Sequence, residues 1–271
     1  MPGRSARLSS PGTPGAPSPA PFIVGGVPGT FKTEGVVLRS IRFGEADRIL
    51  HLYTVERGRV NAIAKGSRRP KSRFGGRLEP FFRLDLMLHE GRSELCTVTG
   101  ASTLDGYPGL RSDGPAIDAA ARGCDAVLRL LDSAEPNRPA YNLLCRYLAL
   151  LDQGSHAPTV ADRPDPAAVG LAFRLKLALA AGFSPELASC SRCGEAEGIS
   201  AFSGASGGVV CASCEGGGFP LSQEAHEFMV TALGRPIAEL PEASERALRQ
   251  AERAINETLE HHAHVRLRSV A

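Results

Sequence analysis

Two pairs of cysteines have the spacing of metal ligands. Cys190 and Cys193 form one CxxC pair, and Cys211 and Cys214 form a second, with seventeen residues between the pairs. Each pair can direct two thiolates at one ion through a tight turn, and four thiolates complete the tetrahedron of a structural zinc site. No ligand position would remain open for water. The spacing therefore predicts one structural Zn²⁺ without a catalytic role.

These thiols have two alternative roles, as disulfides or as a thioredoxin-type redox motif. Disulfides need an oxidising compartment, and the N-terminal sequence lacks the apolar core of a signal peptide. A redox motif needs a βαβ setting, which the flanking helical patterns do not provide. Cys96, Cys124 and Cys145 have no partner at metal spacing, so we expect them to be small core residues.

A second segment has the composition of an anion-binding loop. Residues 65–77 carry six cations and no acid, together with Phe74 and three glycines. Phosphates are natural counterions for such a run, and the Phe74 ring offers a face on which a base could stack. The alternative is a solvated loop that binds nothing. Further cations that could extend a phosphate track are Arg39, Arg42, Arg48, Arg57 and Arg59.

Five short β-rich runs would position this loop. The clearest alternation places Phe82, Leu84, Leu86 and Leu88 on one face of the fourth run. Five mainly antiparallel strands in about 75 residues suit a small closed barrel, the size of an oligonucleotide-binding (OB) fold. The predicted strands cover 35–43, 48–55, 59–66, 80–90 and 94–104.

After residue 111 the pattern changes to alanine and leucine at helical spacing, with proline- and glycine-rich breaks. The predicted helices cover 116–131, 138–151, 166–181, 222–233 and 241–268. We therefore expect an α+β protein of two domains. An N-terminal five-stranded OB-fold β-barrel would occupy residues 31–110, and an α-helical domain with a four-cysteine zinc knuckle at about 187–220 would occupy 111–271.

The net charge of the chain changes sign at the same boundary. Residues 31–110 hold 14 lysines and arginines against 9 acids, a net charge of +5, whereas residues 111–271 hold 15 against 20, a net charge of −5. This asymmetry favours a polyanionic partner for the first part only.

Composition also excludes some classes of protein. Residues 1–30 contain seven prolines, six glycines and no acid, which predicts a disordered tail because such a segment buries too little apolar surface. No apolar run approaches the roughly 18 residues of a membrane span. Walker A and HExxH motifs are missing, so we expect no enzyme.

The segment TEGVVLRSIRFGEADRILHLYTVERGRVNAIAKGSRRPKSRFGGRLEPF at 33–81 resembles the RecO family of recombination mediators. The helical region and the four-cysteine knuckle are similar to those of family members that keep their zinc. The resemblance implies a cytoplasmic, nucleoid-associated bacterial protein that binds single- and double-stranded DNA and anneals complementary strands. It also implies that the protein acts with RecR to load RecA onto DNA coated by single-strand-binding protein. The phosphate contacts would then be Lys65, Arg68, Arg69, Lys71, Arg73 and Arg77.

Two other functions remain open from the residues alone. The same barrel and knuckle could form an RNA- or tRNA-binding module, because a fold does not fix its ligand. An enzyme, either a thiol oxidoreductase or a hydrolase with an unrecognised site, would need a reactive thiolate or activity that survives saturation with zinc.

Overall fold

The computed structural model describes residues 29–91, 93, 95–157, 159 and 163–269. The predicted tail at 1–30 therefore lies almost entirely outside the described residues. Its boundary was two residues too late, because Gly29 and Thr30 already belong to the first strand.

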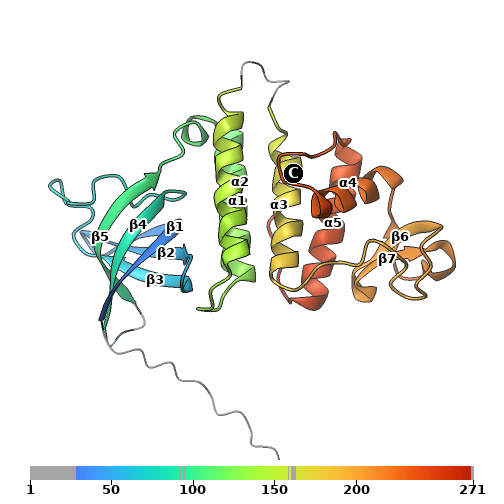
Figure 1. The fold of residues 1–271 in the computed structure, drawn as a ribbon, viewed down its shortest axis with the longest axis horizontal. Helices are drawn as coiled ribbons and strands as arrows, with labels where there is room; N and C mark the ends of the chain where they lie inside the picture. Colours follow the sequence, from blue (N-terminus) through green and yellow to red (C-terminus); the bar gives the residue numbers. More distant parts are fainter. Residues whose placement is uncertain (1–28, 92, 94, 158, 160–162, 270–271) are drawn as a thin grey trace, which may run out of the picture.

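Five strands close into the barrel at the left of Figure 1. Their order around the barrel is β1-β2-β3-β5-β4, with β1 hydrogen-bonded to β4. All neighbours are antiparallel except β3 and β5, which run parallel through the pairs Ala62–Cys96 and Ile63–Thr97. The strands are β1 (Gly29–Phe43), β2 (Asp47–Thr54), β3 (Gly58–Ala64), β4 (Arg83–Glu90) and β5 (Cys96–Asp105).

The first strand is longer than the predicted 35–43 because it forms hydrogen bonds with two neighbouring strands. Its first half, Gly29–Val36, pairs with β4, and its second half pairs with β2. A register shift between Val37 and Arg39 marks a bulge in this long strand. Such a bend lets one strand turn the corner of a barrel.

The barrel interior follows the predicted alternation. Leu84, Leu86 and Leu88 are fully buried inside it, and Phe82 packs at its edge. The opposite face of β4 is half-buried or exposed. The fourth strand begins at Arg83 rather than at residue 80, because Phe81 adopts a left-handed backbone with φ of 76° that interrupts the strand.

Five helices lie where the sequence predicts them, and polar side chains cap the start of each. Asp113, Asn137 and Asp165 precede helices with proline in the first turn, and Ser222 and Ser244 cap the last two. Each cap accepts a hydrogen bond from a backbone N–H of the first turn. The helices are α1 (Gly114–Leu130), α2 (Arg138–Gly154), α3 (Pro166–Ala180), α4 (Gln223–Gly234) and α5 (Glu245–His262).

The prediction of a last helix over 241–268 was too long at both ends. Ser244 starts the helix because its hydroxyl accepts from the N–H of Ala247, while its own N–H and hydroxyl donate to Glu224. The helix ends before His264, whose φ is 55°. No helix in the described part of the chain is long and apolar enough to cross a membrane.

The outer face of the barrel shares a hydrophobic core with the helices, separate from the core inside the barrel. Val36, Leu38 and Tyr53 on the outside of the barrel belong to the same buried cluster as the core residues of α1 to α5. Gly58 shows how close the two parts lie, since a Cβ atom there would be 2.2 Å from the carbonyl oxygen of Glu135. The long helices α1, α2 and α3 therefore stand between the barrel and the C-terminal part (Figure 1).

A small second sheet lies at the other end of the molecule (Figure 1). It has the order β7-β6-β8, with β6 (Ile199–Ser203), β7 (Gly208–Cys211) and β8 (Phe219–Pro220). Gly207, at φ of 76°, turns the chain between β6 and β7, as expected of a hairpin between the two cysteine pairs. Phe202 and Phe219 anchor this sheet in the main core.

Candidate metal centre and basic surface

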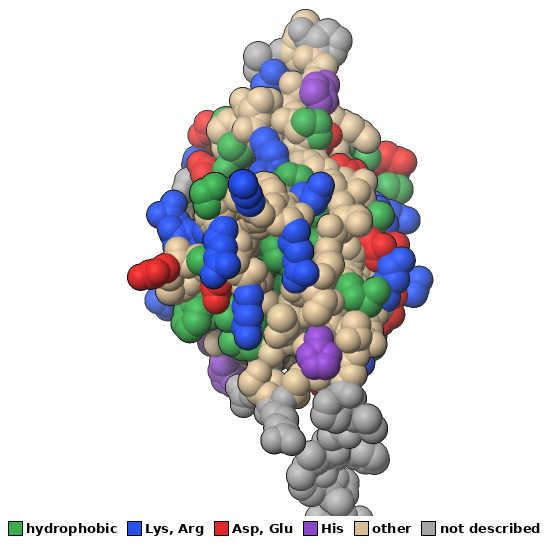
Figure 2. All heavy atoms as spheres, turned by 90° about the vertical axis from the view of Figure 1, so that its left-hand side faces the viewer, with side chains coloured by type: hydrophobic (Ala, Val, Ile, Leu, Met, Phe, Trp, Pro, Cys, Tyr) green, Lys and Arg blue, Asp and Glu red, His purple; other side chains and the backbone are tan. Residues whose placement is uncertain are grey.

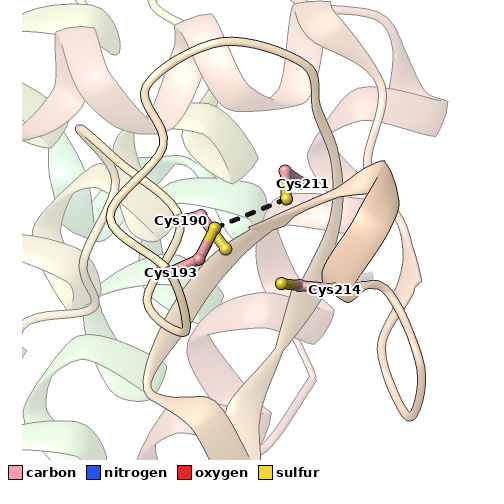
Figure 3. A group of neighbouring side chains, drawn as sticks. All are labelled: Cys190, Cys193, Cys211 and Cys214. Carbon is pink, nitrogen blue, oxygen red and sulfur yellow. Dashed lines mark hydrogen bonds between the residues drawn. The ribbon is translucent and has the colours of Figure 1, made fainter.

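The four cysteines predicted to bind a metal lie together. Cys190 and Cys193 come from the loop after α3, Cys211 ends β7, and Cys214 ends the short turn that follows. All four sulfur atoms lie within 4.8 Å of one another. Figure 3 shows Cys190 and Cys193 on one loop, with their side chains facing those of Cys211 and Cys214.

The arrangement fits a tetrahedral metal ion. Four sulfurs at about 2.3 Å from a shared ion would be about 3.8 Å apart, and the Sγ atoms of Cys193 and Cys211 are 3.7 Å apart. That separation is far from a disulfide bond of about 2 Å. None of the seven cysteines, all of which lie in the described residues, forms a disulfide. The site can hold a metal ion with all four positions filled by sulfur.

The local backbone prepares the site for a cation. Hydrogen bonding to the backbone of Cys211, which outweighs the effect of burial, lowers the pKa of the Cys190 thiol to about 6. Hydrogen bonds with the other thiols raise the pKa of Cys193 and of Cys214, so the four thiols would ionise together only around a bound cation. The N–H of Gly194 donates to the carbonyl of Cys190 at 2.8 Å, and Gly194 has a φ of 80°. This tight turn directs Cys190 and Cys193 at the same point.

The cysteine hairpin is fastened to the helices. The side chain of Arg192 donates to the carbonyl of Cys214 at 2.9 Å, which ties the two cysteine pairs together. Gly204 lies against α5 so closely that a Cβ atom would be 2.6 Å from the Cβ of Glu257. Loss of a bound ion would therefore loosen a segment that contributes to the main core. Cys124, outside the site, is buried in that core, as predicted.

The basic loop lies across one end of the barrel and touches the β1–β2 turn. The N–H of Gly66 donates to Asp47, and the N–H of Arg68 donates to the carbonyl of Ala46. Figure 2 shows lysine and arginine side chains gathered over this end of the molecule, with apolar side chains between them. The six predicted phosphate contacts, Lys65, Arg68, Arg69, Lys71, Arg73 and Arg77, are all exposed.

These cations keep their charges available. None of the six forms an ion pair with a described residue. Their hydrogen bonds go to neutral carbonyls, such as that of Arg77 to the carbonyl of Arg73 at 3.2 Å. Six unpaired charges on one short loop repel one another, and an anion would relieve that repulsion.

Phe74 is buried, although its position in the basic loop suggested that it would be exposed. The prediction that its ring is open to a base was wrong, because only 2% of the residue is exposed. It packs with Leu78 into the barrel core, and the Arg73 guanidinium covers its ring at 4.8 Å. Phe74 and Leu78 thus anchor the loop on the barrel while its cations face solvent.

Two further predicted contacts are engaged elsewhere. Arg48 donates to Glu79 at 2.7 Å and to Ser40 at 3.0 Å, and only 18% of its side chain is exposed. Arg39 pairs with the buried carboxylate of Asp125 on α1 at 3.0 Å. Both arginines therefore stabilise the barrel or its junction with the helices, and phosphate would have to compete with those acids.

Comparison with known proteins assigns both halves of the chain. Residues 29–107 match the family model Recombination protein O N terminal, and residues 111–271 match Recombination protein O C terminal. The chain belongs to the RecO family. A DNA repair protein RecO of Rubrobacter xylanophilus is 39% identical over 234 residues, which cover 86% of this chain and 90% of the relative.

Other RecO proteins are similar over a shorter part of the chain. DNA repair protein RecO of Bifidobacterium animalis subsp. lactis is 40% identical over 67% of this chain and 72% of its own length. That of an Anaeromyxobacter strain is 39% identical over 69% and 71%. The family match agrees with the resemblance found in residues 33–81.

Exposed apolar side chains on the outer face of the barrel were not predicted from the sequence. Ile41 and Phe43, at the end of β1, are 42% and 50% exposed. The sequence signal for this exposed face would have been the position of Ile41 and Phe43 next to the basic residues Arg39 and Arg42. The signal is easily overlooked, because apolar residues that alternate with polar ones in a strand normally face inward.

Proposed function

We propose that this chain is a DNA-binding recombination mediator that binds single- and double-stranded DNA and anneals complementary strands. The observation that carries the proposal is the loop of six exposed, unpaired cations fixed to the end of a closed barrel. Membership of the RecO family supports a role in DNA repair.

The barrel supports the assignment to nucleic acid. Five strands in the order β1-β2-β3-β5-β4, closed by the parallel pair β3–β5, have the size and closure of an OB fold. OB folds bind oligonucleotides over their sheet face and loops. We infer an N-terminal OB domain and a helical domain that begins at about residue 111; the two family models match residues 29–107 and 111–271.

Annealing needs charge rather than chemistry. Two DNA strands repel each other through their phosphates, and six cations on one surface reduce that repulsion while releasing counterions. We therefore assign the six loop cations as phosphate contacts and leave Arg39 and Arg48 outside this set, because acids already pair with both. No catalytic residue is needed, and we propose that the chain is not an enzyme.

The metal ion would be one structural Zn²⁺. Four thiolate ligands favour zinc, and their full coordination leaves no place for water or substrate. The ion would hold the cysteine hairpin against α5, since residues of that hairpin pack in the main core. Its role would be to keep the helical domain in shape.

Partners follow from the family resemblance. We propose that the helical domain presents surfaces to RecR and to single-strand-binding protein, so that RecA is loaded on the DNA that the barrel holds. Such a protein would work in the cytoplasm, at the nucleoid.

Fluorescence anisotropy of labelled oligonucleotides across a salt series tests the proposal. Single-stranded DNA, duplex DNA and RNA of equal length are compared, followed by a strand-annealing assay with complementary DNA. We expect salt-sensitive binding of both DNA forms and faster annealing with protein. A clear preference for RNA would favour an RNA- or tRNA-binding module instead. Failure to bind any of the three at low salt would refute nucleic-acid binding.

A further inference from the structure

Four apolar side chains form a continuous strip across the outer face of β1, β2 and β3. Ile41 lies directly opposite Ile49, and Ile49 lies directly opposite Ile63, so the three share one face of the sheet. Phe43 is two residues beyond Ile41 and continues the strip on the same face. We define the apolar strip as Ile41, Phe43, Ile49 and Ile63.

The apolar strip is not part of the protein interior. Ile49 and Ile63 are half-buried, and neither packs against the barrel core or the core shared with the helices, among the described residues. Polar groups take the inner face at this end of the barrel instead, where Arg48 bonds to Ser40 and Glu79. Exposed apolar side chains that lie side by side, unlike singly exposed ones, are a mark of interaction surfaces. This arrangement favours a surface that meets a ligand.

The charged residues next to the apolar strip indicate which kind of ligand it binds. The turn after Phe43 accepts hydrogen bonds from the basic loop, because Arg68 donates to the carbonyls of Ala46 and Gly44 at 2.9 and 3.3 Å. Lys65 follows Ile63 by two residues and is exposed. Unpaired cations therefore border the apolar strip. Flat apolar groups joined to phosphates, which are the bases of a single strand, match both parts of this surface.

We propose that the apolar strip is a binding site for unpaired bases and that Phe43 is the ring on which a base stacks. The inference rests on the proposed function and deepens it, because it assigns the phosphates to the loop and the bases to the strip. In a duplex the bases are stacked inside the helix and cannot reach Phe43. The strip would therefore favour single strands, while the loop binds both forms.

The test separates bases from phosphates with two ligands of equal charge. One is an oligothymidylate of about 16 nucleotides, at the upper end of the site size of one OB fold. The other is an abasic strand of the same length. We expect the full chain to prefer the thymidylate by about five- to a hundredfold, the range for one stacked base. Phe43→Ala should lose most of that preference and keep its salt dependence.

Matched variants keep the result specific. Phe43→Tyr should retain the preference, whereas Phe43→Leu should lose it although it remains apolar. Met87→Ala removes a side chain that is 39% exposed on β4, outside the strip, and should change nothing.

A spectroscopic readout does not depend on affinity. The chain contains no tryptophan, so Phe43→Trp introduces a single indole fluorophore, and stacking on thymine should quench it. Neither the abasic strand with Phe43→Trp nor the thymidylate with Met87→Trp should give this quenching.

The two proposals fail in different ways. Equal affinity of the unchanged chain for both strands, or quenching of the Phe43→Trp variant by the abasic strand, would overturn the base site and leave DNA binding intact. No binding of either strand by the unchanged chain would overturn both.

Discussion

Replacing Arg68, Arg69 and Lys71 together by glutamine should flatten the salt dependence of DNA binding. All three side chains are exposed, and none forms an ion pair with a described residue. Their loss therefore removes charge without uncovering an acid. The bonds of Arg68 that fix the loop come chiefly from its backbone N–H, which the substitution keeps.

The magnitude follows from the number of free cations. Each phosphate contact contributes about 0.7 to 0.9 to the slope of log affinity against log salt, so six contacts give a slope of about −4 to −5. Removing three should reduce its magnitude by about 2 to 3. Between about 50 and 200 mM salt, the three lost contacts would account for an affinity change of about 20- to 40-fold.

Anisotropy titrations at several salt concentrations measure the slope directly. The matched control replaces Arg146, Arg235 and Arg246 by glutamine, three exposed cations outside the barrel that form no ion pair with a described residue. It changes the net charge by the same amount outside the barrel. The reasoning is refuted if the loop variant keeps the original slope, or if the control flattens it equally.

Three further predictions concern stability and the metal. Cys211→Ser should lower bound metal from one equivalent to none and lower the melting temperature, because metal-binding energy is folding energy in such a site. Cys96→Ser is the control. An unchanged metal content by mass spectrometry would contradict the four-thiolate centre. Phe74→Ala should reduce the free energy of unfolding by about 3 to 5 kcal/mol, as for other buried phenylalanines. Phe43→Ala should reduce it far less. Similar denaturation midpoints for the two variants would contradict the burial of Phe74 and the exposure of Phe43. Gly58→Ala should destabilise the junction of barrel and helices, because its φ of 57° disfavours a side chain and the new Cβ would meet Glu135. Normal thermal melting of that variant would show that the junction is looser than the structure indicates.

The sequence by itself determined most of the elements and the four cysteines that could hold a metal ion. CxxC spacing identified all four cysteines because a tight turn fixes the geometry within each pair. Alternation in the fourth strand and capping residues before the helices located these elements because both signals are local. The basic loop was visible in composition alone. Boundaries were less accurate where tertiary partners decide them, as in β1, which extends to Gly29 because β4 offers it hydrogen bonds.

Only the tertiary structure decided which side chains of the basic surface are free. Nothing local distinguishes Arg48 from Arg68, yet Glu79, which pairs with Arg48, is 31 residues away in the sequence. Asp125 likewise reaches Arg39 from a helix 86 residues later. The same holds for the aromatic rings, since closure of the barrel buries Phe74 within the loop and leaves Phe43 outside. Burial and charge pairing depend on contacts between distant segments, and those contacts exist only after the chain has folded.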